Sequence, residues 1–343
     1  MNDTDKGVFA AGEPVLVTGA TGFSGSVLVR KLCERGARVR AIARSSSNRD
    51  SLQGLPVEWH LGDVFDPAVI ARAMVGTKYV FHVAAAYRQA GLTDEVYRQV
   101  HVESTQRLAE AAVKTPGFKR FVHVSTVGVH GHVERPPADE KYPFYPGDIY
   151  QRTKADAELW IREFASKSGL PVTVIRPAAI YGPGDRRLLK VFKMAEWPVC
   201  LVPGRSSGPL YHLIHVDDLT EVLILAAIHP RASGEVFICG DPAALSLAGI
   251  LGIVGSEYGR KVRILRVPVW PLFLAAAICE TACRPFGIAP PIYRRRVAFF
   301  TKDRSFNTAK LRERLGYVYR RTTEQGLRET ARWYRDHGWV KVR

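Results

Sequence analysis

The sequence lacks the features that mark several classes of protein. Its 343 residues include only five cysteines, at positions 33, 200, 239, 279 and 283, and no CxxC pair. Neither a disulfide framework nor a metal site is therefore expected. No stretch reaches the ~18–20 uncharged apolar residues that a membrane-spanning helix needs. The first residues, MNDTDKGVFAAGEP, lack the basic and apolar regions of a signal peptide, so we expect a cytoplasmic protein with reduced thiols.

The composition is that of a globular protein with a strong excess of positive charge. Apolar residues make up 46% and charged residues 24% of the chain, and the length suggests about two domains. The net charge is +16, and the last 60 residues hold 16 basic and 5 acidic side chains. Such a surface can attract an anionic membrane, a nucleic acid or an acidic ligand. No finger, helix-turn-helix or aromatic RNA motif accompanies it, so no specific nucleic-acid partner is expected.

Short apolar runs alternate with helical patterns from the start of the chain. This alternation predicts βαβ units in an α/β fold with a doubly wound (Rossmann) parallel sheet. The near-continuous apolar runs are typical of strands covered on both faces. The predicted strands are 15–19, 38–44, 57–63, 79–85, 120–126, 172–178 and 235–240, and the clearest helices are 23–35, 93–114 and 150–168.

The rhythm changes after about residue 180, where glycine and proline cluster in YGPGD and VPGRSSGP. Residues 14–180, with 211–240 returning to them, are predicted to form the dinucleotide-binding domain. Residues 181–210 and 241–340 are predicted to form a smaller, mostly helical substrate-binding lobe. We expect the ligand where this lobe meets the carboxyl edge of the sheet.

A glycine-rich turn lies between the first predicted strand and the first helix. In TGATGFSG, Gly19, Gly22 and Gly25 have the GxxGxxG spacing that lets backbone approach a pyrophosphate at a helix N-terminus. With Thr21 and Phe23, they are predicted to bind a dinucleotide.

Later strand ends predict which dinucleotide is bound. Arg44, at the end of the second strand, suits the 2′-phosphate of NADP, whereas an acidic residue there would suit NAD. We therefore predict NADP, with NAD as the alternative. Asp63 and Val64 after the third strand, and Ala84 and Ala85 after the fourth, are further predicted cofactor contacts.

A tyrosine and a lysine are spaced for acid–base chemistry. Tyr150 and Lys154 lie four residues apart on a predicted helix and so share one face. A nearby ammonium favours the phenolate and moves the pKa of the tyrosine toward neutral pH. Ser125 and Thr126, at the end of the fifth strand, can hydrogen-bond a substrate oxygen. These four residues are the predicted catalytic group.

Together these motifs resemble the extended short-chain dehydrogenase/reductase family, which includes NAD(P)-dependent epimerases, dehydratases and 3β-hydroxysteroid dehydrogenases. The resemblance includes HVSTVGVHG, YxxxK, IRPAAIYGPGD and HVDD and extends from Val15 to near Trp339. It implies that Thr126 and Ser125 position the substrate oxygen, Tyr150 is the acid/base, and Lys154 orients ribose and tyrosine. It also implies that Pro177 contacts the nicotinamide half and that the protein is a homodimer.

Two positions depart from the family pattern. Where members often read NVxGT, this chain has His101 and Ser104, so His101 either replaces the asparagine of a proton relay or is simply packed in its helix. Sugar dehydratases carry an Asp-Glu pair after the strand hydroxyl. Val127 and Gly128 stand there instead, so dehydration is not expected.

The substrate is predicted to be apolar. VPVWPLFLAAAIC (267–279) and the basic lobe resemble the 3β-hydroxysteroid and sterol-4-carboxylate dehydrogenase branch, so we expect a secondary alcohol or ketone on a sterol-like or other lipid substrate. The alternative is a nucleotide-sugar 4-epimerase or reductase, with Arg186, Arg187 or Arg205 binding the diphosphate. A non-catalytic NADP-binding scaffold is a third interpretation, which loss of Tyr150 or Lys154 would have favoured.

The same apolar segment raises the question of membrane contact. Thirteen residues are too few to span a bilayer as a helix, but the segment can lie in the interface with Trp270 at headgroup depth. Arg263, Arg266, Arg284 and the run 294–296 flank the apolar stretches. The alternative is that the segment forms the core of the lobe or a dimer contact.

Overall fold

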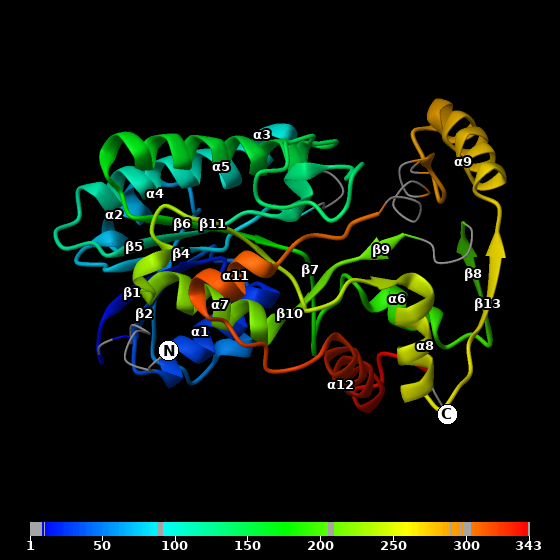
Figure 1. Cartoon of the computed structure of the whole chain (residues 1–343). Coiled ribbons are helices and arrows are strands. Elements are labelled where there is room, and N and C mark those ends of the chain that lie inside the picture. The colour runs from blue at the N-terminus through cyan, green and yellow to red at the C-terminus, as the bar shows by residue number, and fades with distance from the viewer. Residues whose placement is uncertain are drawn as a thin grey trace.

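The computed structural model of the chain describes residues 9, 11–87, 92–204, 209–288, 290–294, 297 and 303–341 (Figure 1). Its centre is a sheet of seven parallel strands in the order β11-β6-β5-β4-β1-β2-β3. All seven predicted strands belong to this sheet, which confirms the fold class. Their bounds are β1 (Pro14–Thr18), β2 (Arg38–Ala43), β3 (Val57–Leu61), β4 (Tyr79–His82), β5 (Arg120–Val124), β6 (Val172–Pro177) and β11 (Val236–Cys239).

Helices cover both faces of the sheet because successive strand residues point to opposite sides. Val15 and Val17 pack on the face covered by α1 (Phe23–Glu34), α7 (Val216–Ile228) and α11 (Ala309–Leu315). Leu16 packs on the other face, covered by α2 (Pro67–Met74), α4 (Ser104–Val113) and α5 (Ile149–Ser168). The sheet is therefore buried on both sides, and its carboxyl edge is where backbone and side chains can meet a ligand.

The helix predicted over 93–114 is divided in three. α3 (Asp94–Arg98) runs into a π-helical turn, η3 (Gln99–Glu103), before α4 begins. The Ser104 hydroxyl donates to the Val100 carbonyl at 2.6 Å and the Thr105 hydroxyl to the His101 carbonyl at 2.6 Å. Such side-chain bonds to backbone compete with the α-helical pattern, and π turns are frequent at functional sites.

The remaining elements pack beside the carboxyl edge of the sheet (Figure 1). α6 (Leu189–Met194), α8 (Leu247–Glu257) and α12 (Thr323–Asp336) share a core that includes Phe192, Leu251 and Tyr334. The same part of the structure contains α9 (Val269–Cys283) and three strand pairs that sequence analysis did not predict. They are β7 (Ala179–Tyr181) with β10 (Leu213–His215), β9 (Leu210–Tyr211) with β12 (Leu245–Ser246), and β8 (Val199–Pro203) with β13 (Arg263–Val267).

The structure also shows the state of the cysteines and the lengths of the helices, on which two of the predictions from composition depend. All five cysteines are free thiols; Cys200 and Cys239 are buried and the other three half-buried. Within the described ranges, every helix is too short or too polar to cross a membrane.

Candidate active site

The glycine-rich turn follows β1 and is held by close backbone packing. Gly19 has φ +71°, and a Cβ there would lie 2.7 Å from the Ala84 nitrogen. A Cβ on Gly25 would lie 2.0 Å from the Gly19 carbonyl oxygen. A larger residue at Gly19 would push the turn away from the loop that follows β4, and one at Gly25 would push α1 away from the turn, so both glycines are required by geometry.

The turn leads into a helix end that suits an anion. The N-cap of α1 is Gly22, which offers no side-chain acceptor, and its first turn, beginning at Phe23, contains no acidic residue. The first backbone N–H groups of a helix lack intrahelical partners and carry the positive end of its dipole. Gly19, Thr21, Gly22, Phe23 and Gly25 thus form a turn able to bind a phosphate group.

Below the turn lies a buried polar chain that sequence analysis missed. The Ser104 hydroxyl already donates to Val100, so the Nε2–H of His82 donates to it at 3.1 Å. The other ring nitrogen, Nδ1, accepts from the Thr18 hydroxyl at 2.8 Å, and Thr18 in turn accepts from the Ala84 N–H at 3.3 Å. Burial lowers the pKa of His82 to about 3, so the ring is neutral and fixes the ends of β1 and β4 to α4.

The predicted lysine is anchored at the end of β5. Lys154 is 2% exposed, and its Nζ donates to the Val124 carbonyl at 2.5 Å, directly before Ser125. Burial lowers the pKa of its ammonium to about 8, although Glu158 opposes this shift. Tyr150 lies one turn earlier on α5, whose N-cap is Asp148. Its ring packs edge-to-face against Tyr87, with centroids 5.3 Å apart.

The two strand-end hydroxyls have different environments. Thr126 caps the 3₁₀ turn η4 (Val127–His130) by accepting from the Gly128 N–H at 3.0 Å, which leaves its own O–H free to turn toward another acceptor. The Ser125 hydroxyl is buried and has no hydrogen-bond partner among the described residues. A buried unpaired hydroxyl is costly, which is typical of a site that binds something else.

His101 lies against the predicted acid/base. Its ring packs edge-to-face on Tyr150 with centroids 5.4 Å apart. Nε2 accepts from the Ala86 N–H at 3.0 Å, so the proton of the neutral ring is on Nδ1 and is donated to the Thr153 hydroxyl at 2.8 Å. The Thr153 hydroxyl in turn donates a hydrogen bond to the Ile149 carbonyl at 2.8 Å. Both ring nitrogens are therefore hydrogen-bonded. Burial holds the pKa of His101 well below its usual value, so the ring is uncharged.

The remaining predicted cofactor residues lie at the carboxyl ends of their strands. Arg44 directly follows β2 and is exposed, and Asp63 is exposed after β3. Val64 is half-buried, Ala84 is buried and Ala85 is exposed. Pro177, the last residue of β6, is buried beside Cys239 of β11.

A largely apolar pocket opens beside η4, the turn that Thr126 caps. It encloses about 810 Å³, its open mouth included, and its wall contains Gly128 and Gln151, close in sequence to Thr126 and Tyr150. The polar side chains of the wall are those of Gln151, Tyr211, His212 and Arg304. No carboxylate lies in it among the described residues. Apolar lining comes from Val127, Ala179, Leu188, Val191, Phe192, Leu213, Leu247, Ile250, Phe306 and Leu327.

His212, although it lines the pocket, has both ring nitrogens in use. Nε2 donates to the Asp241 carbonyl at 2.7 Å, and Nδ1 accepts from the Phe306 N–H at 3.2 Å. Burial lowers the pKa of the ring, so it is a neutral part of the wall.

Two of the three arginines considered for a diphosphate can be placed. Arg187 donates from Nε to Asp185 at 3.0 Å and lies over the rings of Phe23 and Tyr87, 5.5 Å from each centroid. Arg186 instead lies over Trp339, at 5.1 Å. Arg205 lies outside the described residues, as do Arg295 and Arg296 of the flanking basic run.

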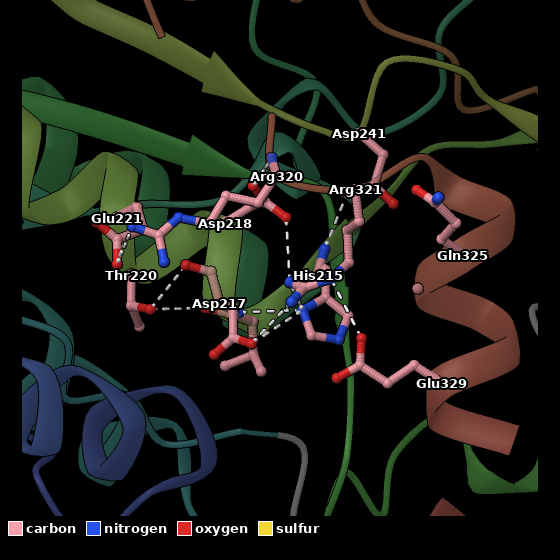
Figure 2. Close-up of polar contacts among 12 residues, drawn as sticks. His215, Asp217, Asp218, Thr220, Glu221, Asp241, Arg320, Arg321, Gln325 and Glu329 are labelled. Carbon is pink, nitrogen blue, oxygen red and sulfur yellow. Dashed lines mark hydrogen bonds and ion pairs between the residues drawn. The ribbon is translucent and has the colours of Figure 1, made fainter. Parts of the chain in front are cut away.

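The HVDD motif has a role that sequence analysis did not anticipate (Figure 2). His215, Asp217 and Glu329 come close enough to hold a metal ion. The guanidinium of Arg321 contacts all three, at 2.7 Å from His215 Nδ1, 3.2 Å from Asp217 and 3.2 Å from Glu329. It also pairs with Asp218 at 3.3 Å. Arg321 supplies the positive charge of this cluster and ties α7 to the segment that leads into α12.

The geometry of the turn and of α5 agrees with a comparison to known families. The profile of the NAD-dependent epimerase/dehydratase family matches residues 15–240. The chain belongs to this family. The resemblance to extended short-chain dehydrogenases is thereby confirmed, and the protein is an enzyme of an NAD-dependent family.

Members of the epimerase/dehydratase family with different activities are similar over nearly the whole chain. A 3-beta-hydroxysteroid dehydrogenase of Mycolicibacterium neoaurum is 31% identical over 338 residues, covering 94% of this chain and 91% of that protein. A UDP-glucose 4-epimerase of Vibrio cholerae is 26% identical over 328 residues, covering 92% and 94%. The crystal structure of gox2253 superposes with a TM-score of 0.79 at 30% identity, covering 96% of this chain and 100% of that one.

Proposed function

We propose that the protein is an NADP-preferring oxidoreductase that interconverts a secondary alcohol and a ketone on a sterol-like or other lipid substrate. The observation that carries the substrate class is the apolar wall of the pocket, which includes Val127 and Gln151, the sequence neighbours of Thr126 and Tyr150. Such a wall favours an apolar ring system over a sugar, whose hydroxyl groups would lose hydrogen bonds to water there.

The residues present fit a nicotinamide dinucleotide. The uncapped N–H groups at the start of α1 suit its pyrophosphate. The Ser125 hydroxyl, which has no hydrogen-bond partner among the described residues, provides a polar group directly after β5. Arg44, with no acidic residue beside it before Asp50, supports the preference for the 2′-phosphate of NADP. When bound, the dinucleotide supplies or accepts the hydride.

The chain itself handles the proton and the substrate oxygen. Tyr150 gives the hydroxyl proton to the substrate in reduction and takes it back in oxidation. Lys154 is a buried cation near neutral pH, which favours the phenolate of Tyr150. Thr126 accepts the Gly128 N–H, so its O–H can be donated to the substrate oxygen, with Ser125 beside it.

We assign residues 14–180 and 211–240 to cofactor binding and residues 181–210 and 241–340 to the substrate. A lobe of this kind closes the pocket from the side opposite the sheet, with Phe192, Ile250 and Leu327 in the wall. A homodimer is the expected assembly, and we expect no requirement for a metal.

A nucleotide-sugar 4-epimerase or reductase is the second candidate. Arg304 is the observation in its favour, since one guanidinium in the pocket wall can bind a phosphate group. Arg186 and Arg187 support it less, because each already lies over aromatic rings.

Turnover of the purified protein tests both candidates. NADPH and NADP⁺ are each supplied with a panel of sterols, 2-alkyl-3-oxoacids and UDP-sugars, and products are identified by mass spectrometry. We expect dinucleotide-dependent turnover of an apolar carbonyl or carbinol compound and none of the sugars. Epimerisation of a UDP-sugar without net consumption of dinucleotide would establish the second candidate instead.

A further inference from the structure

Helix α9 is apolar but lies almost entirely outside the core. Only Ala276 of its fifteen residues is buried. Trp270, Leu274 and Ile278, at i, i+4 and i+8 on one face, are 70%, 54% and 61% exposed. In Figure 1, α9 lies beyond β13, at the end of the molecule far from the large sheet. This excludes the interpretation of the segment as lobe core.

Exposed apolar side chains also occur on β13, which directly precedes α9 in the chain, on its partner β8 and on the residues just after α9. Leu201 of β8 and Leu265 of β13 are partners in the strand pair, and both are exposed. Phe286 and Ile288, just after α9, are exposed as well. We call this set the α9 surface: Leu201, Leu265, Trp270, Leu274, Ile278, Phe286 and Ile288. Exposed apolar groups gathered in this way mark an interaction site rather than ordinary scatter.

The charge around the α9 surface indicates what it contacts. Residues 258–302 contain nine Lys and Arg and a single acidic residue, Glu280, which is paired with Arg294 at 2.8 Å. Arg263, Arg266 and Arg284 are exposed. An anionic surface complements this charge, whereas a second copy of the chain would bring the same positive charge to the same face.

The dimensions favour a helix lying in a membrane interface. Fifteen residues rise only ~22 Å as a helix, less than the ~30 Å hydrocarbon core. A helix with Trp and Leu on one exposed face, flanked by arginines, is suited to the headgroup boundary. We propose that the α9 surface docks the protein peripherally onto an anionic lipid bilayer.

The docking surface is linked to the pocket by the chain itself. Arg304 and Phe306 of the pocket wall follow Ile288 of the α9 surface by 16 and 18 residues in the sequence. The α9 surface and much of the pocket wall belong to the same proposed substrate-binding lobe. Docking would therefore bring the lobe that contains the apolar pocket to the lipid. The proposal rests on exposure and charge alone and does not depend on which substrate the enzyme turns over.

Flotation of the full-length protein with vesicles tests the proposal. Vesicles are pure phosphatidylcholine or contain 30% phosphatidylglycerol, at low and at physiological salt. Binding is expected to the anionic vesicles and to weaken with salt. Combining Trp270→Ser, Leu274→Ser and Ile278→Ser should lower partitioning at least about tenfold. Each of Arg263→Gln and Arg284→Gln should lower it about fivefold.

Matched substitutions elsewhere on the surface provide controls. Val75→Ser, Val113→Ser and Val318→Ser remove three exposed apolar side chains far from α9, and Arg38→Gln with Arg72→Gln removes two exposed arginines. These variants should bind like the wild type. Circular dichroism and dinucleotide affinity establish that every variant is folded.

Three outcomes would overturn the proposal. One is wild-type protein that does not float with anionic vesicles even at low salt. Another is a triple-serine variant that binds as well as the wild type. The third combines two results: the wild type does not bind vesicles, and it forms a dimer in analytical ultracentrifugation without lipid that the triple-serine variant does not form. A second copy of the chain would then cover the α9 surface.

Discussion

The environment of Tyr150, one of thirteen tyrosines in the chain, supports its proposed role in proton transfer. Its ring is held between Tyr87 and His101, and Lys154 follows one turn later with its ammonium fixed on Val124. These contacts hold the ring of Tyr150 in one position, one helical turn from a buried lysine.

Removing the phenolic oxygen should therefore abolish turnover. Tyr150→Phe keeps the ring between its aromatic neighbours, so we expect dinucleotide affinity to be nearly unchanged while kcat falls ~10²–10⁴-fold. Steady-state kinetics and fluorescence titration with NADPH measure the two quantities. A purified variant with wild-type activity would remove Tyr150 from the mechanism.

Arg44 should determine the choice of dinucleotide. Arg44→Asp replaces a partner of the 2′-phosphate with an acceptor for a ribose hydroxyl that also repels phosphate. Dissociation constants for NADP and NAD, measured on both proteins, should shift toward NAD in the variant. Arg38→Gln, an exposed arginine at the start of the same strand, is the control. An unchanged ratio would mean that Arg44 points away from the ribose.

A role for His101 in positioning Tyr150 and a role in packing alone predict different kinetics. His101→Phe keeps an aromatic ring against Tyr150 but removes the hydrogen bonds to Ala86 and Thr153. If His101 positions Tyr150, kcat should fall about tenfold to a hundredfold at unchanged dinucleotide affinity, and His101→Gln should recover part of it. If His101 only fills space, His101→Phe should be fully active.

Among the connecting elements, the loop between β7 and α6 brings a cation to the glycine-rich turn. Arg187 lies over Phe23, the first residue of α1, so the positive end of the helix and a guanidinium are close together. Asp185 accepts from the Arg187 Nε at 3.0 Å, and an anion bound at the start of α1 would be a second partner for this guanidinium.

Arg187 should accordingly contribute to dinucleotide binding. We expect Arg187→Gln to raise the dissociation constant of NADPH about tenfold and to reduce its dependence on salt. Arg186→Gln is a matched control, because the guanidinium of Arg186 lies over Trp339 and not over Phe23. Isothermal titration at two salt concentrations measures the effect, and equal constants for the two variants would contradict it.

The elements also differ in how well the sequence predicts them. The central strands of the large sheet could be predicted because they are mostly apolar runs, such as Tyr79–His82, that are buried on both faces. The β8–β13 pair could not, since exposed side chains and nearby prolines weaken its pattern. The bond from His101 to Thr153 joins residues 52 apart, so only the folded chain brings them together. Candidate site residues could be proposed from motifs in the sequence, whereas their buried hydrogen-bond partners could not.

For the molecule as a whole, a buried carboxyl group links the sheet to the smaller strand pairs. Asp241 accepts from the Tyr181 hydroxyl at 2.8 Å and from the His215 N–H at 3.0 Å. Burial is the main cause that raises its pKa from 3.8 to about 7. The folded protein thus keeps a proton on Asp241 that the unfolded chain loses near pH 3.8.

The contribution of Asp241 to the free energy of unfolding should consequently fall as pH rises toward 7. Between these two pKa values the folded state binds the extra proton, so the contribution of Asp241 declines by up to ~1.4 kcal/mol per pH unit and levels off above pH 7. Asp241→Asn cannot titrate and should lack this component. Urea unfolding of both proteins at pH 5, 6, 7 and 8 measures the difference, and parallel curves would contradict the assignment.

The strand order has a consequence for how the protein is made. β6 ends at Pro177, but β11, which pairs with its outer edge, begins at Val236, about 60 residues later. At ~5–20 residues per second, a ribosome leaves this edge open for ~3–12 s. Open edges of buried, apolar strands recruit other chains. The nascent protein is therefore most prone to misassembly in this interval, and chains that stop before Val236 should aggregate rather than persist as a smaller nucleotide-binding unit.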